Sequence, residues 1–270
     1  MLYNAKNGSL TLGNARMDYI RFGSGSRNLI ILPGLGDGLT TVKGTALPMA
    51  LSYRLFARDF TVYMFSRRQP LPDGFSTRDM AQDQKTAMDL LGIEKADILG
   101  VSMGGMIAQH LAADYPERVN RLVLAVTCPR ANPMLTSAID RWVEMADKGD
   151  HTALMDDNVR QIYSEDYYRK NRWLIPLMGI LTKPKSYRRF LIQAEACRSH
   201  DCFDRLSTIA CPTLVMAGGQ DAVVGEAPSR ELADNIPGAR LLCYPQWGHG
   251  VYEEEPAFNK AVLSFLLETD

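Results

Sequence analysis

The stretch at residues 97–114 constrains the fold of this 270-residue chain more than any other part of the sequence. A short apolar run leads into the pentapeptide G-V-S-M-G at 100–104, and a pattern with helical spacing follows at once. The apolar run predicts a buried strand, and the spacing predicts a helix directly after it. The chain therefore turns sharply at Ser102. Glycines are needed on either side because side chains there would strike the neighbouring strand and helix.

A serine at the apex of a strand–turn–helix unit forms a nucleophile elbow. The turn forces Ser102 into strained backbone angles, which points its hydroxyl into a cleft. Ser102 also lies at a helix N-terminus, where free backbone N–H groups favour negative charge. The alternative interpretation is a glycine-rich turn with a passive serine, and the rest of the chain decides between the two.

Short apolar runs alternate with helical patterns on both sides of this motif. Their alternation predicts an α/β fold with a mostly parallel, doubly wound sheet that is covered by helices on both faces. Two β-like runs at 9–12 and 17–22, separated by the turn residues Gly13-Asn14, predict an antiparallel hairpin at a sheet edge. The other expected strands are 28–32, 61–65, 121–127, 212–217 and 239–244, and the expected helices are 46–58, 77–91, 226–235 and 253–267.

The alternation stops at Pro129 and resumes at Pro212. The residues between them have helical spacing as far as about 203 and predict an inserted helical cap at 129–203. The core domain is then formed by 1–128 and 204–270. As a group, the large side chains of the insertion predict a cap with an apolar underside, although some must pack the segment itself; they are Met134, Trp142, Met145, Met155, Tyr163, Tyr167, Tyr168, Trp173 and Met178.

Charge and composition exclude several classes of partner. The formal net charge is −1 and no basic stretch suggests a nucleic-acid surface. The pairs Arg67-Arg68 and Arg188-Arg189 are expected to be solvated or to cap helices. The first residues show no signal peptide, and no apolar stretch is long enough to span a bilayer, so we expect no membrane insertion.

The cysteines indicate a reducing compartment. There are five, an odd number, and none forms a C-x-x-C pair. This usage fits buried thiols in the cytoplasm and not a disulfide framework. Cys197 and Cys202 flank His200, but their spacing matches no zinc pattern, so we expect neither a metal nor another cofactor.

A serine hydroxyl needs a base to take its proton, and the base needs an acid that orients it. Of the four histidines, at positions 110, 151, 200 and 249, His249 follows the last predicted strand in a G-H-G loop. That loop lies at the carboxyl edge of the sheet, the edge that also carries Ser102. Asp221 directly follows the strand at 212–217 and is the candidate acid, although an Asp there also suits a turn. The order Ser, acid, His is the one expected on a sheet of this kind.

Two backbone N–H groups would stabilise the oxyanion of acyl transfer by several kcal/mol. Met103, the residue after the candidate nucleophile, supplies one of them. The second is expected from Leu35, in the glycine-rich loop that follows the first buried strand. The alternative for this segment is an ordinary loop between a strand and a helix.

The order of these motifs resembles the α/β-hydrolase fold superfamily over residues 9–267. The resemblance rests on P-G-L, G-V-S-M-G, G-G-Q-D and G-H-G, which end at residues 35, 104, 221 and 250. The stretch at 100–127 is similar to the branch that holds esterases, lactonases, cofactor-free haloperoxidases and carbon–carbon bond hydrolases. The resemblance implies an eight-stranded type of sheet and the following roles: nucleophile Ser102, acid Asp221, base His249, and oxyanion donors Leu35 and Met103.

Two positions separate the chain from parts of this superfamily. Pro33 stands where many members have His before the loop glycine, which changes how the loop is supported. The elbow residue is Ser and not Asp, so the resemblance does not extend to the chemistry of haloalkane dehalogenases or epoxide hydrolases.

Three functions are compatible with these features. We expect a serine hydrolase that acts on a small carboxylic ester or lactone with hydrophobic parts. A second possibility keeps the same residues but cleaves a carbon–carbon bond or forms a peracid. The third is a non-catalytic receptor for a small ligand, because fold alone does not define function.

Overall fold

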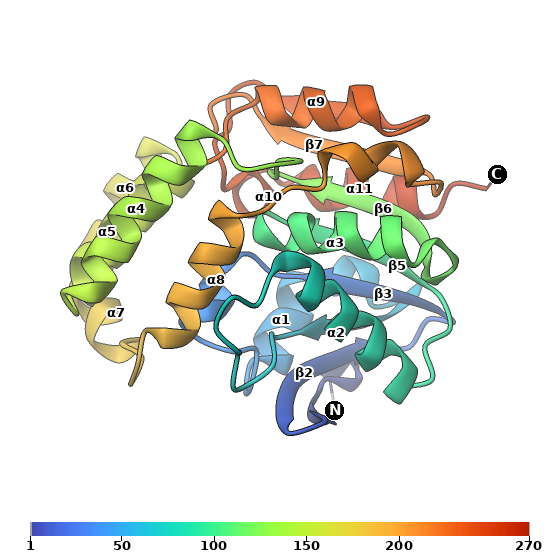
Figure 1. Cartoon of the computed structure of the whole chain (residues 1–270), viewed down its shortest axis with the longest axis horizontal. Helices are drawn as coiled ribbons and strands as arrows, with labels where there is room; N and C mark the ends of the chain where they lie inside the picture. Colours follow the sequence, from blue (N-terminus) through green and yellow to red (C-terminus); the bar gives the residue numbers. More distant parts are fainter. Residues whose placement is uncertain (1, 270) are drawn as a thin grey trace.

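A computed structural model describes residues 2–269 and contains one eight-stranded sheet (Figure 1). The strand order is β1-β2-β4-β3-β5-β6-β7-β8, with β1 and β2 antiparallel to each other and β2 antiparallel to β4. From β4 to β8 every pairing is parallel, which confirms the predicted mostly parallel sheet with an edge hairpin. The strands are β1 (Lys6–Leu12), β2 (Ala15–Gly23), β3 (Arg27–Leu32), β4 (Phe60–Phe65), β5 (Ala96–Val101), β6 (Val119–Ala125), β7 (Thr213–Gly218) and β8 (Arg240–Tyr244).

Helices cover both faces of this sheet (Figure 1). One apolar cluster joins the sheet to α2 (Thr77–Leu90), α3 (Met103–Asp114) and α9 (Ala227–Asn235). A second cluster on the other face joins it to α1 (Ala46–Ser52), α10 (Val251–Glu254) and α11 (Phe258–Leu266). The central strands β4, β5 and β7 are buried at every position, as expected for a parallel sheet that is covered on both sides.

Two predicted helices are shorter than the periodicity indicated. The helix expected at 46–58 ends at Ser52 and is followed by the short 3-10 turn η3 (Arg54–Phe56). The last helix is divided at Pro256 into α10 and α11, and Glu255 is extended there. Proline restricts the residue before it to extended angles, so an apolar pattern can continue through a break in the helix.

The residues between β6 and β7 form a group of helices on one side of the core (Figure 1). Their two ends are held together, because Ala131 N donates to His200 O at 2.9 Å and Cys202 N donates to Pro129 O at 2.8 Å. The predicted division of the chain into a core and a cap at 129–203 stays a prediction. The helices are α4 (Pro133–Asp147), α5 (His151–Ile162), α6 (Glu165–Asn171), α7 (Ile175–Leu181) and α8 (Arg188–Arg198), with the short turn η5 (Arg172–Leu174) between α6 and α7.

A buried pair of histidines lies where this group joins the core. The rings of His110 on α3 and His200 meet edge to face, with 5.3 Å between their centroids. Thr77 Oγ1 lies 2.9 Å from Nδ1 of His200. Burial disfavours the charged rings and lowers their pKa, to about 4 for His110 and to about 3 for His200.

We expect this pair to make the stability of the protein sensitive to acid. A histidine whose pKa is lowered in the folded state stabilises the fold above its ordinary pKa, and that stability is lost as the pH falls. We predict that the His200→Gln variant loses about 2 kcal/mol less stability than wild type between about pH 7 and pH 4.5. Urea unfolding of both proteins at the two pH values measures the difference. An equal loss in both proteins would show that His200 takes up no proton on unfolding, because its ring would already be protonated in the folded protein at pH 4.5.

Candidate active site

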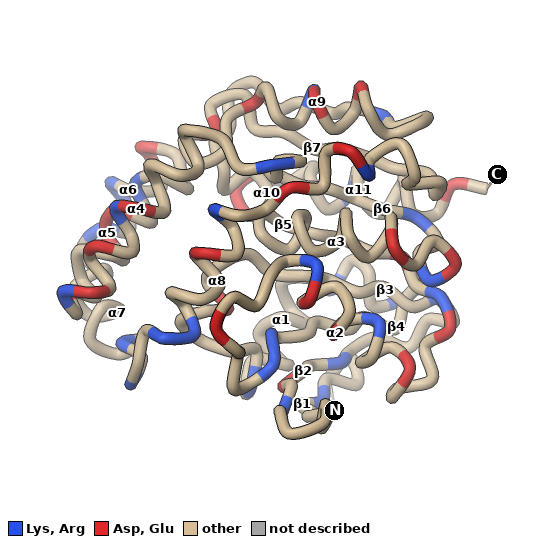
Figure 2. The backbone as a smooth tube through the Cα atoms, viewed as in Figure 1, with Lys and Arg blue, Asp and Glu red and all other residues tan. Residues whose placement is uncertain are grey.

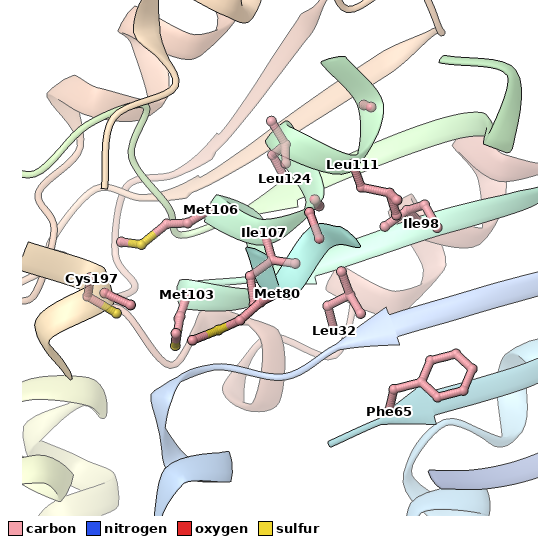
Figure 3. Packing of buried hydrophobic residues seen from close by; sticks show 14 of the residues in the cluster. Leu32, Phe65, Met80, Ile98, Met103, Met106, Ile107, Leu111, Leu124 and Cys197 are labelled. Carbon is pink, nitrogen blue, oxygen red and sulfur yellow. The ribbon is translucent and has the colours of Figure 1, made fainter. Parts of the chain in front are cut away.

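Ser102 lies at the apex of the turn between β5 and α3. Its backbone angles, φ 52° and ψ −120°, fall outside the regions that non-glycine residues usually occupy. A Cβ on Gly104 would lie 1.9 Å from the carbonyl oxygen of Leu32, and one on Gly100 would lie 2.6 Å from that of Gly104. The predicted reason for both glycines is therefore confirmed. Figure 3 shows apolar side chains of α3, such as Ile107, packed beside Leu32 of β3 and Met80 of α2.

The neighbouring strand β6 holds the strained turn in place. Ser102 N donates to Ala125 O at 2.9 Å, and the Thr127 hydroxyl donates to Ser102 O at 2.8 Å. Val126 between them has φ +45°, a costly angle for a β-branched side chain. The second strained residue beside the elbow was not predictable, because nothing in the run at 121–127 differs from an ordinary strand.

His249 and Asp221 are hydrogen-bonded to each other, with 2.7 Å between Nδ1 and Oδ2, and both side chains are buried. The other oxygen of Asp221 accepts from the N–H groups of Val223 and Val224 at 2.8 and 2.9 Å. The carboxylate is thus fixed on both oxygens. Because Nδ1 of His249 is hydrogen-bonded to Asp221, Nε2 is the ring nitrogen that can accept a proton.

The loops that carry these two residues are bound together. Gln220 N donates to Trp247 O at 2.9 Å, linking the loop after β7 to the loop after β8. The backbones approach so closely that a Cβ on Gly218 would lie 2.2 Å from Gly248 O. Gly250 N in turn donates to Ile162 O at 2.6 Å, which joins the His249 loop to the end of α5.

Ser102 and His249 line the same cavity, which has a volume of about 300 Å³ and also reaches Leu35. This volume is near the lower end of the range for small-molecule sites. Most of the remaining wall is apolar and comes from both the core and the helical group between β6 and β7. It includes Met106, Leu135, Ile139, Trp142, Ile162 and Val223.

The two candidate oxyanion donors begin helical turns beside this cavity. Met103 is the first residue of α3, and Leu35 is the first residue of the 3-10 turn η2 (Leu35–Gly38). The first N–H groups of a helix have no acceptor within it, so they can bind an anion. A Cβ on Gly34 would lie 3.5 Å from Cβ of Ser102, so the loop passes within contact distance of the serine.

An ion cluster beneath this loop was missed by the sequence analysis. Asp37 is buried on η2, and its Oδ2 accepts from Arg67 N at 3.0 Å and from the guanidinium of Arg189 on α8. Arg67 is itself buried, and its Nη2 donates to Pro33 O at 2.5 Å. The prediction that these arginines are solvated or cap helices was wrong for Arg67 and Arg189.

The cluster contacts the loop at Pro33, the position where many members of the superfamily have His, because Arg67 donates to the Pro33 carbonyl. Burial lowers the pKa of the Arg67 guanidinium, while the carboxylate of Asp37 opposes that effect. Arg188, by contrast, pairs with exposed Asp73, as a solvated arginine would. Adjacent arginines look alike in a sequence, and only the long-range contact with Asp37 distinguishes Arg67 and Arg189.

The histidine candidate on α5 has a hydrogen-bonding partner of its own. His151 is on α5, where its Nε2 lies 3.1 Å from the Thr182 hydroxyl. Among the described residues, no group of three or more His, Cys, Asp or Glu side chains could hold a metal ion. Of the large side chains in the helices between β6 and β7, Trp142 and Tyr163 line the cavity as expected. The expectation was wrong for Met134, Trp173 and Met178, which are exposed.

The chain belongs to the α/β-hydrolase family, because the sequence model of the alpha/beta hydrolase fold matches residues 27–256. It is 32% identical over 197 residues to a 2-hydroxy-6-oxo-6-phenylhexa-2,4-dienoate hydrolase from Burkholderia cepacia, covering 69% of this chain and 68% of that one. It is 28% identical over 255 residues to RutD of Caulobacter sp. (strain K31), to which carbamate hydrolase activity is ascribed, covering 90% and 91%.

The fold is also shared with solved structures. The enol-lactonase from Burkholderia xenovorans LB400 aligns with a TM-score of 0.81 at 24% identity, over 97% of this chain and 100% of that one. The eight-stranded α/β-hydrolase architecture expected from the motifs is thus confirmed. The two relatives named above carry hydrolase names, and the chain shares the α/β-hydrolase fold.

The close contact at Gly104 predicts that adding one methyl group there strongly destabilises the folded protein. In Gly104→Ala the added carbon meets backbone atoms of Leu32, which cannot rotate away as a side chain could. We therefore expect the free energy of unfolding to fall by about 3 kcal/mol or more. Gly36→Ala is the matched control, since no atom lies within 4 Å of its added Cβ. That variant should change stability by less than about 1 kcal/mol. Equal denaturation midpoints for the two variants would contradict the steric argument.

The buried ion cluster predicts an unequal effect of removing two positive charges. Arg67→Met leaves Asp37 buried with one cation fewer, and we expect a loss of about 3 kcal/mol in the free energy of unfolding. Lys148→Met removes an exposed partner of Glu144 and should cost less than about 1 kcal/mol. Urea denaturation of both variants measures the difference. A similar small loss for both would show that the cluster does not hold the loop.

Proposed function

We propose that this protein is a serine hydrolase that cleaves a small carboxylic ester or lactone with hydrophobic parts through an acyl-enzyme on Ser102. One observation carries the proposal: Ser102 and a histidine bonded to a buried aspartate line the same small, mostly apolar cavity. Nucleophile, base and orienting acid are the groups that acyl transfer requires.

Each group has a defined part in the proposed reaction. His249 takes the proton of Ser102 as Oγ attacks the carbonyl carbon of the substrate. Asp221 holds the ring in the required tautomer and stabilises its positive form. The N–H groups of Leu35 and Met103 stabilise the oxyanion of the tetrahedral intermediate. His249 then protonates the leaving alkoxide, and water that it activates releases the acid from Ser102.

The cavity supports a small substrate with apolar parts. Its volume of about 300 Å³ is enough for a compact ester or ring, and Leu135, Ile139 and Trp142 offer apolar contact. Relatives in the same family include a protein to which carbamate hydrolase activity is ascribed. An enol-lactonase shares the fold. These names favour acyl chemistry at a carbonyl carbon.

Carbon–carbon bond hydrolysis is the second candidate. Two relatives at 30% and 32% identity are named as hydrolases of 2-hydroxy-6-oxo dienoic acids. This chemistry would use the same serine and histidine. Faster turnover of such a keto acid than of any ester would establish it in place of ester hydrolysis.

The cysteines support a cytoplasmic location for this activity. All five are free, and Cys128, Cys197 and Cys202 are buried. Burial raises the pKa of the Cys197 thiol to about 12, so it stays protonated and unreactive at neutral pH. Such thiols persist in a reducing compartment.

The role of Ser102 is tested by covalent labelling. We expect a fluorophosphonate to label the wild type once, at Ser102, and a panel of p-nitrophenyl esters to be hydrolysed with a preference for short acyl chains. Ser102→Ala should lose the label and reduce kcat by about 10³-fold or more. Ser199→Ala, which alters an exposed hydroxyl, is the control and should behave as wild type. Folded protein that takes no label, or ligand binding without turnover, would contradict the proposal and favour a receptor.

A further inference from the structure

The surface of η5 and α7 exposes an unusual concentration of large apolar side chains. Trp173, Ile180 and Leu181 are each 70% or more exposed, at 72%, 74% and 70%. Leu177 and Met178 are also exposed and lie on α7 together with Ile180 and Leu181, whereas Trp173 lies on η5. We refer to Trp173, Leu177, Met178, Ile180 and Leu181 as the α7 patch. Soluble surfaces rarely gather apolar residues in this way unless something binds there.

The patch is not the side of α7 that packs onto the protein. That inner side is made by Ile175 and Gly179, which are buried. Gly179 lies so close to α5 that an added Cβ would be 2.6 Å from the Thr152 hydroxyl oxygen. The helix is therefore already seated, and its apolar outer side does not serve the fold.

The segment of chain that carries the patch has charges of one sign. The chain as a whole is balanced, with 30 Lys and Arg against 31 Asp and Glu. From 167 to 194 it has no acidic residue, but it has seven basic ones. They flank the patch on both sides, at 169–172 and 183–189, and Figure 2 shows basic segments following α7 toward α8.

Several of these basic side chains have no acidic partner. Within the part of the chain that the structure describes, Lys170, Arg172 and Lys185 are exposed and form no ion pair. Lys183 reaches only a backbone carbonyl, that of Gly149. Positive charge is thus available on either side of the apolar residues, where it can attract an anionic partner.

We propose that the α7 patch docks the protein onto an anionic lipid surface. Exposed Trp and Leu side chains flanked by Lys and Arg are the composition that lies in the interface of a bilayer. The apolar residues would enter the headgroup boundary while the basic ones meet anionic headgroups. Docking is peripheral, since no helix among residues 2–269 is long and apolar enough to cross the bilayer.

The charge pattern favours this occupant over a second copy of the chain. A symmetric dimer through the patch would bring the same basic residues of both copies together, and like charges across an interface are unfavourable. An anionic membrane offers an apolar layer for the exposed apolar side chains and negative headgroups for the basic ones. Docking would also set the cavity near the lipid, because α7 packs on α5 and α5 supplies Asn158 and Ile162 to the cavity wall.

Flotation with lipid vesicles tests the proposal on the full-length protein. We expect binding to vesicles of phosphatidylglycerol and phosphatidylcholine, little binding to phosphatidylcholine alone, and release by salt. The triple variant Lys170→Glu/Arg172→Glu/Lys185→Glu should bind at least about 100-fold more weakly, at about fivefold for each charge lost. Replacing Leu177, Ile180 and Leu181 by Ser should also abolish binding.

Matched controls separate the patch from general charge effects. Lys43→Glu/Arg58→Glu/Lys260→Glu makes the same change in net charge at exposed sites away from α7 and should bind as wild type. The emission of Trp173 should shift to shorter wavelength on binding, and Trp173→Phe should remove that shift. Circular dichroism shows that each variant is folded, so these outcomes do not depend on the proposed catalytic role.

Three results would overturn the inference. One is folded wild type that does not float with anionic vesicles. The second is equal binding by the control and the patch variants. The third is a dimer in sedimentation velocity that disappears when the apolar patch residues are replaced, which would assign the patch to a second copy.

Discussion

The close approach of α3 to the end of β3 is the constraint on which the rest of the site depends. Because the carbonyl of Leu32 occupies the space where a Cβ of residue 104 would lie, only glycine lets the chain turn from β5 into α3 at this point. The turn lifts Ser102 out of the sheet and sets the start of α3 beside the glycine-rich loop after β3. One steric contact thus positions the serine, one candidate oxyanion amide and the wall of the cavity together.

Local patterns predicted the parts of this arrangement that depend on neighbours in the chain. The alternation of apolar runs and helical spacing gave the sheet, and motifs after strands gave Ser102, Asp221 and His249, of which the last two are hydrogen-bonded. Contacts between distant segments were not predictable. Arg67 and Arg189 both meet Asp37, which is distant from each of them in the sequence, and Val126 has a positive φ beside the turn at Ser102. The break at Pro256 was visible in the sequence but was outweighed by periodicity.

The ion cluster and the backbone hydrogen bonds connect the two groups of elements that form the cavity. One group is the sheet with its loops, and the other is the set of helices between β6 and β7. Arg189 reaches from α8 to Asp37 under the loop after β3, and Ile162 at the end of α5 accepts from Gly250 beside His249. Groups on either side of Ser102 are therefore fastened to the helices between β6 and β7. Substitutions in those helices can displace the loops that carry Asp37 and His249 as well as change the shape of the apolar wall.

The paired ends of the segment between β6 and β7 have a consequence for how that segment can vary. Residues 129–131 and 200–202 run side by side and are joined by two backbone hydrogen bonds, so the chain leaves and re-enters the core at nearly one point. A segment attached in this way can change in length without moving any strand. The helical side of the cavity wall can therefore change in shape while the strands and the turn at Ser102 stay where they are.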